Sequence, residues 1–188
     1  MNKAALKRMA IELREEVGIG VHDVFDPYEL AKLYGVKVIP MSSSGCSEEA
    51  LHHFQVNRPD VFSGALVPFG TGTVILENDL HPHERKRSTC SHEMAHVVLE
   101  HPFTAALVNE RGCRMANREH EQQAAELSGE LLLPFEAAKL LARQQASDEQ
   151  AAQKFEVSVD LARWRLNSTG ARKIASRAKA AYAKLRTR

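Results

Sequence analysis

Apolar residues recur at helical spacing between Leu6 and Val17, which predicts an amphipathic helix over residues 3–17. A second helix is marked by its two ends. Asp26 suits the N-cap, where its carboxylate accepts hydrogen bonds from the first turn, and Gly35 lies just past the last turn. The beginning of the chain is therefore predicted to be helical.

The pattern then changes to one that is typical of β-strands. Val36 to Ile39 are predicted to form a short strand, and residues 62–68 and 73–77 are rich in residues that favour strands. Because Phe69-Gly70-Thr71-Gly72 joins the last two, we expect a hairpin. Residues 41–60 are polar and without periodicity, so we expect them to be irregular. Together the strands predict a small antiparallel sheet.

Helical spacing returns at about residue 83. The predicted helices cover residues 83–100, 119–133, 135–145, 148–155 and 158–168. A small sheet followed by helices is an α+β arrangement. We expect a first domain over residues 1–145, with its core at about 25–145, and a C-terminal helical subdomain with a basic tail over residues 146–188.

Composition sets limits on the class of function. The chain has 188 residues and a formal net charge of +1, so it carries no overall excess of positive charge that would mark a nucleic-acid-binding protein. The charge is unevenly distributed, because no acidic residue follows Asp160. The basic residues beyond it are Arg163, Arg165, Arg172, Lys173, Arg177, Lys179, Lys184, Arg186 and Arg188.

The cysteines and the lack of long apolar runs bear on the compartment. Cys46, Cys90 and Cys113 are an odd number without CxxC spacing, which favours reduced thiols over a disulfide framework. No apolar run is long enough to span a membrane, and the first residues mix charges without the apolar segment of a signal peptide. We therefore expect a soluble cytoplasmic protein.

The segment Ser91-His92-Glu93-Met94-Ala95-His96 contains a HExxH motif. His92 and His96 are one helical turn apart, so both imidazoles project from the same face and suit two corners of a tetrahedral zinc site. Glu93 is then placed to accept a proton from water that attacks a carbonyl group. The motif also occurs by chance in helices that bind nothing, so a third ligand decides the interpretation.

The residues that follow the motif do not supply that third ligand. The extended motif of the metzincins requires Gly and His where this chain has Leu99 and Pro102, so that class is rejected. His101 lies five residues after His96, which on a continued helix directs it away from the ligand face.

The next predicted helix supplies a better third ligand. Its small and apolar face is expected to pack against the HExxH helix, and of its acidic residues only Glu121 lies there. A buried carboxylate is costly unless it is paired or bound to metal. Glu121 is thus predicted as the third zinc ligand, and an ion pair with an arginine is the alternative. Glu119, Glu126 and Glu130 are expected to face solvent.

Two segments resemble the ImmA/IrrE family of metallopeptidases, which typically shows an arginine-led FTLAHELGH sequence. One runs from Arg87 to Leu99 around the HExxH motif, and the other is EQQAAELSGELLLP from Glu121 to Pro134. The similarity covers most of residues 25–170. The chain departs from the family pattern at positions that are not ligands, namely Glu100, Ala125 and Leu127.

The resemblance implies a gluzincin-like zinc peptidase domain over residues 1–145. It implies one Zn²⁺ per chain, with Glu93 as the general base and with metal ligands His92, His96 and Glu121. Many members of the family are encoded on mobile elements or belong to stress circuits, and they resemble proteases that cut a transcriptional repressor. We therefore expect a zinc-dependent endopeptidase that makes limited cuts in a helix-turn-helix repressor.

A second hypothesis comes from residues 148–168, where two helices joined by Glu156-Val157 resemble a helix-turn-helix pair. With the basic tail they would form a non-catalytic DNA-binding or regulatory interaction module. Packing of Leu161 and Trp164 on the catalytic domain is the simpler expectation. We therefore expect nucleic acid to bind weakly or not directly.

Two further expectations concern the surroundings of the motif. Cys90 is expected to be a small buried residue rather than a redox-sensitive thiol. In zinc peptidases an edge strand beside the metal commonly receives the substrate as an added strand, and we expect strand 73–77 to guide it.

Overall fold

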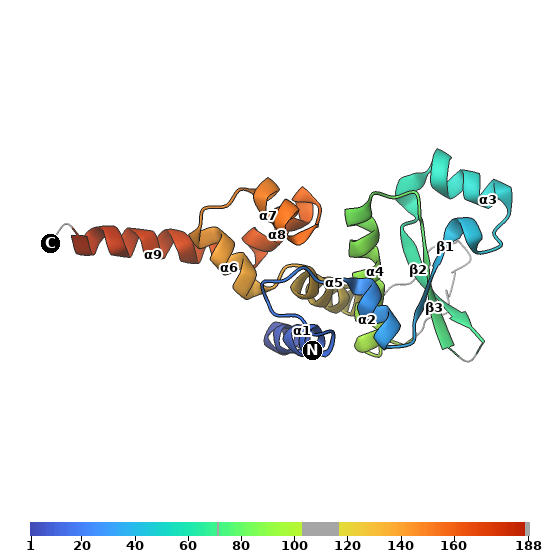
Figure 1. The fold of residues 1–188 in the computed structure, drawn as a ribbon, viewed down its shortest axis with the longest axis horizontal. Coiled ribbons are helices and arrows are strands. Elements are labelled where there is room, and N and C mark those ends of the chain that lie inside the picture. Colours follow the sequence, from blue (N-terminus) through green and yellow to red (C-terminus); the bar gives the residue numbers. More distant parts are fainter. Residues whose placement is uncertain (71, 103–116, 187–188) are drawn as a thin grey trace.

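The computed structural model of the chain describes residues 1–70, 72–102 and 117–186. A small sheet lies at one end of the molecule, helices α4 and α5 occupy its middle, and helices α6 to α9 continue toward the opposite end, where the C-terminus projects (Figure 1). The mixture of helices with a small sheet confirms the predicted α+β class. Among the described helices, none has both the length and the apolar character needed to cross a membrane.

The helices predicted from periodicity are present and end close to the predicted residues. The strands are β1 (Lys37–Pro40), β2 (Gly64–Phe69) and β3 (Gly72–Glu77). The longer helices are α1 (Lys3–Glu16), α2 (Pro27–Leu33), α4 (His83–Val98), α5 (Arg118–Leu132), α6 (Phe135–Arg143), α7 (Asp148–Phe155), α8 (Val159–Ser168) and α9 (Ala171–Arg186). Shorter helical segments between β1 and β2 are Met41–Ser43, α3 (Glu48–His52), His53–Asn57 and Pro59–Val61.

Two segments are more helical than the sequence predicted. Residues 41–60 are not irregular, and α3 begins where the Ser47 side chain accepts a hydrogen bond from Ala50 N at 3.2 Å. Residues 171–186, expected only as a basic tail, form α9 and pack against α6. Many of the apolar positions of α9 are alanine, which favours a helix strongly but gives a weak hydrophobic pattern.

The sheet is mixed rather than fully antiparallel. Its strand order is β1–β3–β2, in which β2 and β3 form the predicted antiparallel hairpin and β1 runs parallel to β3. Side chains alternate in both kinds of strand pair, so the alternation does not reveal strand direction. Because β3 already has a partner on each side, it cannot accept an added strand. The expectation for strand 73–77 is wrong, and β2 is the edge strand of the hairpin.

The contact between α4 and α5 lies at the centre of the core. Met94 and Ala95 of α4 and Ala124 of α5 are completely buried. Small residues allow close approach at this contact, where Ser91 Oγ donates a hydrogen bond to Ser128 O at 3.4 Å. The predicted packing of the small face of α5 against the HExxH helix α4 is therefore confirmed.

The described core continues into the C-terminal helices. Phe155 of α7 and Leu166 of α8 belong to the same cluster of buried side chains as Leu131 of α5. Arg165 of α8 is completely buried, and its guanidinium lies 2.6 Å from the carboxylate of Glu130 on α5. These contacts hold α8 against α5. The division of the chain near residue 145 stays a prediction.

Candidate metal centre

His92 and His96 lie on a half-buried side of α4, because other faces of the helix are packed into the core. Cys90 and Met94 point into that core and are completely buried. The Nε2 atoms of the two histidines are 3.2 Å apart. Two imidazole lone pairs at this distance repel each other unless a proton or a cation lies between them.

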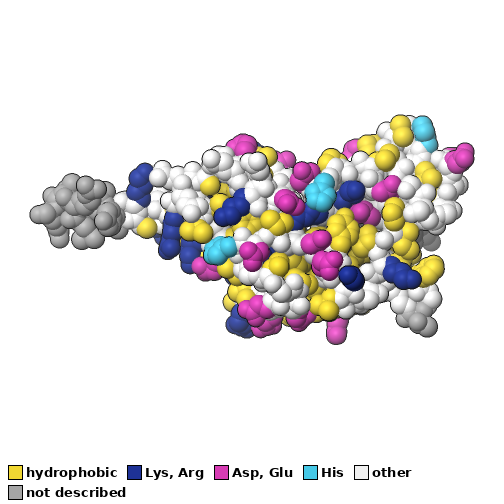
Figure 2. Space-filling view, viewed as in Figure 1, with side chains coloured by type: hydrophobic (Ala, Val, Ile, Leu, Met, Phe, Trp, Pro, Cys, Tyr) yellow, Lys and Arg dark blue, Asp and Glu magenta, His cyan; other side chains and the backbone are white. Residues whose placement is uncertain are grey.

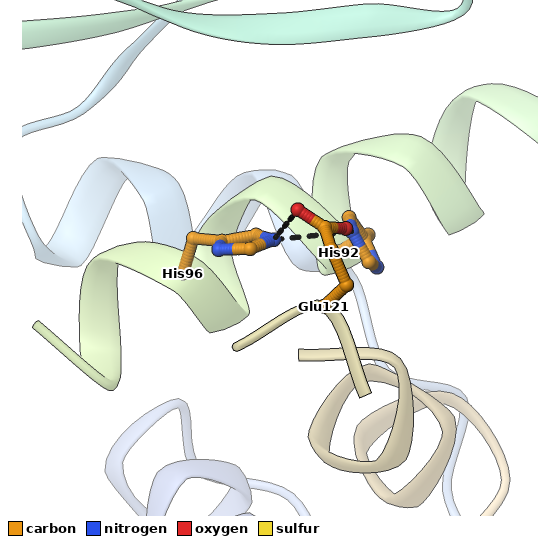
Figure 3. Close-up of side chains that lie close together, drawn as sticks. All are labelled: His92, His96 and Glu121. Carbon is orange, nitrogen blue, oxygen red and sulfur yellow. Dashed lines mark hydrogen bonds and ion pairs between the residues drawn. The ribbon is translucent and has the colours of Figure 1, made fainter. Parts of the chain in front are cut away.

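Glu121 reaches the same point from the first turn of α5 (Figure 3). Its Oε2 atom lies 3.2 Å from Nε2 of His92, and its Oε1 atom lies 3.6 Å from Nε2 of His96. The helix begins beside it because the Asn117 side chain accepts a hydrogen bond from Glu119 N at 2.9 Å. The structure therefore brings together the three side chains that the sequence predicts as metal ligands.

The separations between these atoms fit a tetrahedral zinc ion. Ligand atoms placed about 2.0–2.1 Å from zinc at tetrahedral angles lie about 3.3–3.4 Å from one another. The observed separations are 3.2, 3.2 and 3.6 Å. Among the described residues, His92, His96 and Glu121 form the group of three whose metal-ligating atoms all lie within 4.8 Å of one another. Two imidazoles and one carboxylate also form a donor set that catalytic zinc uses.

The protonation state of His96 suits a cation. Burial of the side chain, and then the nearby charge of His92, lower the pKa of His96 to about 4. At neutral pH its imidazole is therefore uncharged and has a lone pair to offer to a metal.

His101 contacts the other ring nitrogen of His96. The Nδ1 atoms of the two rings are 3.0 Å apart, and Nε2 of His101 lies 3.3 Å from Oε1 of Gln123. If Nε2 of His96 held a cation, its Nδ1 would carry the proton and donate to Nδ1 of His101, whose Nε2–H would donate to Gln123. A partner of this kind fixes the ring orientation of a metal ligand.

His101 is not one of the three converging ligands, as expected, but its ring does not point away from the site. α4 ends at Val98, and Glu100 has a left-handed φ of 50°, so the chain turns back on itself. His101 N then donates to His96 O at 3.1 Å. The prediction continued the helix past its end, and a left-handed residue other than glycine has no clear signal in the sequence.

Glu93 lies next to His92 on the side of α4 that faces the sheet. Its Oε2 atom accepts a hydrogen bond from Leu66 N at 3.2 Å. Leu66 belongs to the edge strand β2, so this N–H group points out of the sheet toward α4. The carboxylate therefore lies between the cluster of histidines and the free edge of the sheet. The sequence predicts Glu93 as a base, but it gave no sign of the strand that holds it.

The comparison with known families agrees with this geometry. The family model described as the IrrE N-terminal-like domain, which represents a group of metallopeptidases, matches residues 31–167. The chain belongs to the ImmA/IrrE family. A search of curated proteins finds no significant match. The match confirms the resemblance seen around the HExxH motif, and it extends through α7 and nearly all of α8.

Two acidic residues of α5 that were expected to face solvent do not do so in this ImmA/IrrE domain. Glu130 is 2% exposed and pairs with Arg165, and the side chain of Glu126 is 13% exposed and lies 3.0 Å from Lys3 Nζ. Glu119 is exposed as expected. The prediction from helical spacing considered one neighbour of α5, namely α4, whereas Lys3 of α1 and Arg165 of α8 contact other faces of the helix.

The buried thiol of Cys90 gives a first testable prediction. Burial raises the pKa of the Cys90 thiol well above its usual range, so little of the reactive thiolate forms near neutral pH. We expect iodoacetamide to leave Cys90 unmodified in the folded ImmA/IrrE domain, to modify the half-buried Cys46 first, and to modify both in urea. Mass spectrometry of the peptides measures this order. Rapid modification of Cys90 in the folded protein would instead support a redox role. Cys113 lies outside the described residues.

Proposed function

We propose that the chain is a zinc-dependent endopeptidase in which His92, His96 and Glu121 hold one zinc ion and Glu93 is the general base. The observation that carries the proposal is the convergence of three ligand atoms at 3.2–3.6 Å with Glu93 beside the first histidine. A zinc ion bound there would polarise the carbonyl group of a peptide bond and lower the pKa of water.

Glu93 would transfer the proton that hydrolysis requires. The oxygen of water forms a bond to the carbonyl carbon, the C–N bond breaks, and the leaving nitrogen needs a proton. Glu93 accepts a proton from the attacking water and returns it to that nitrogen. The hydrogen bond from Leu66 N, at 3.2 Å, keeps the carboxylate oriented while it does so.

The substrate is proposed to lie along β2 in an extended conformation. β2 is an edge strand next to Glu93, so a peptide that pairs with the outward carbonyl groups of this edge passes the general base while Leu66 N stays bonded to Glu93. Main-chain hydrogen bonds of this kind need an extended segment, which a compact domain does not offer. We therefore propose limited cuts in an exposed or transiently unfolded segment of a helix-turn-helix repressor, in a cytoplasmic mobile-element or stress-response circuit.

The alternative of a non-catalytic DNA-binding module receives less support from the basic residues of α8 and α9. Arg165 is completely buried, and Arg163 and Arg172 both pair with Asp148, at 3.0 and 2.5 Å. These guanidinium groups already have partners within the protein. In the view of Figure 2, Lys and Arg side chains are spread from the α9 end of the molecule to the sheet end, with Asp and Glu side chains among them.

Digestion of a partner tests the proposed function. We expect the zinc-replete protein to cut a helix-turn-helix regulator encoded near its own gene at about one or two sites, and to leave casein largely intact, because an edge strand selects extended segments with modest side-chain selectivity. Mass spectrometry of the products locates the cuts. Broad and rapid degradation of unrelated unfolded proteins would contradict a regulatory role.

A further inference from the structure

A pocket of about 520 Å³ opens beside the general base, and most of the residues that line it have no role in the proposed hydrolysis. His92 and Glu93 of α4 line one part of it, and Leu161 and Trp164 of α8 line another. Its volume falls within the range of sites that bind small ligands. A peptide whose scissile bond lies at Glu93 would therefore have a neighbouring side chain within reach of this pocket.

The lining favours an apolar side chain over a basic one. Leu161, Trp164 and Ala125 supply apolar surface, and the polar groups are mainly hydroxyls. Among the lining residues the cation is Arg85, whose Nε and Nη2 atoms donate to Ser63 Oγ at 3.1 and 2.8 Å. The Glu93 carboxylate also lines the pocket, so the guanidinium of Arg85 offsets its negative charge and a basic side chain gains no net attraction there. The apolar wall gains free energy by covering a large apolar group.

Contacts with α5 hold the α8 wall in place. A Cβ atom at Gly129 would lie 2.6 Å from Cζ3 of Trp164, so glycine is needed for the indole to rest directly on α5. The next residue, Arg165, is anchored by its buried ion pair with Glu130. Trp164 is still 41% exposed. A large aromatic ring that is held in one place and remains partly open to solvent is suited to contact a ligand.

We propose that this pocket binds a large apolar side chain next to the scissile bond. Leu161 and Trp164 are the specificity-determining residues, and Arg85 offsets the attraction of the Glu93 carboxylate for basic side chains. The position of the scissile bond rests on the proposed peptidase function, but occupancy of the pocket can be measured without turnover. Helix α8, whose sequence resembles part of a DNA-binding motif, thereby takes part in the choice of peptide substrate.

The fluorescence of Trp164 tests the proposal directly, because it is the single tryptophan of the chain. The zinc-loaded Glu93→Gln protein is titrated with blocked alanine peptides that carry leucine, lysine or no substitution at the centre. We expect the leucine peptide to bind at least about 10-fold more tightly than the alanine peptide, as hydrophobic pockets discriminate by such factors. Its binding should shift the emission to the blue as the indole loses water. The lysine peptide should bind no better than the alanine peptide.

Variants that retain the reporter separate the two parts of the pocket. Leu161→Ala should lower the preference for the leucine peptide over the alanine peptide, because one of the two large apolar residues of the wall is lost while Trp164 remains. Arg85→Glu should raise the affinity for the lysine peptide by about 10-fold, since the rim charge is reversed. Arg85 is exposed, so this change is expected to leave the fold intact. The matched control is Leu33→Ala, at a 55% exposed leucine on α2, and it should change neither preference.

Two outcomes would contradict the proposal that the pocket binds a large apolar side chain. One is an unchanged Trp164 emission with every peptide, and the other is equal affinity for all three peptides in the protein with an intact pocket. A different outcome bears on the proposed function alone. If the peptides show the expected preferences but the wild-type protein cuts no partner, the pocket stands and the peptidase proposal fails.

Discussion

Replacing Glu93 with glutamine is expected to slow cleavage of the partner protein by about 10²–10⁴-fold while fold and zinc content stay unchanged. Glutamine has nearly the same shape as glutamate, and its amide oxygen can accept the hydrogen bond that Leu66 N donates at 3.2 Å. The change therefore removes the proton acceptor while the contact with β2 can be kept. Single-turnover cleavage measures the loss, and elemental analysis of the same sample measures the zinc.

The matched control for this variant is Glu84→Gln. Glu84 is an exposed carboxylate in the first turn of the same helix, so its loss removes an equal charge without touching the site. Its cleavage rate should stay close to that of the wild type. A Glu93→Gln protein that retained full function in the cell would contradict the enzyme interpretation, because a module that acts by binding alone does not need the base.

Replacing Glu121 with alanine is expected to lower zinc affinity, and replacing Glu130 with alanine is expected to lower stability, although both residues are glutamates of α5. Glu121→Ala should lower zinc affinity by more than about 100-fold, since even partners of metal ligands contribute about 10–100-fold. Glu130→Ala should lower the free energy of unfolding by about 3–5 kcal/mol, because the buried guanidinium of Arg165 loses its nearest carboxylate, at 2.6 Å, and is left with the more distant one of Glu126, at 3.7 Å.

Zinc titration and urea unfolding of the metal-free protein measure the two effects separately. Glu121 has a side chain that is 46% exposed, so its loss should change the stability of the metal-free protein little. The neighbouring exposed residue provides the control, and Gln122→Ala should change neither property. If Glu130→Ala lowered zinc affinity at normal stability, the assignment of the third ligand to Glu121 would be wrong.

The spacing of apolar and polar residues along the chain was enough to predict much of this protein. Two histidines one turn apart lie on one face of any helix, so the common orientation of His92 and His96 depends only on helical geometry. The phase of Glu121 follows in the same way from the small and apolar residues around it. The α+β class and the family were predicted from such patterns and are confirmed.

Contacts between distant segments were decided by the tertiary structure alone. Three such contacts are the parallel pairing of β1 with β3, the contact of His101 with His96, and the burial of Glu130 against Arg165. The local sequence pattern around these residues does not specify their partners. A helical wheel shows which side of a helix is apolar, but it does not show how many neighbours cover that helix. Where several elements pack on α5, the free energy of a charged side chain depends on which of them supplies the opposite charge, and that is known only after the chain has folded.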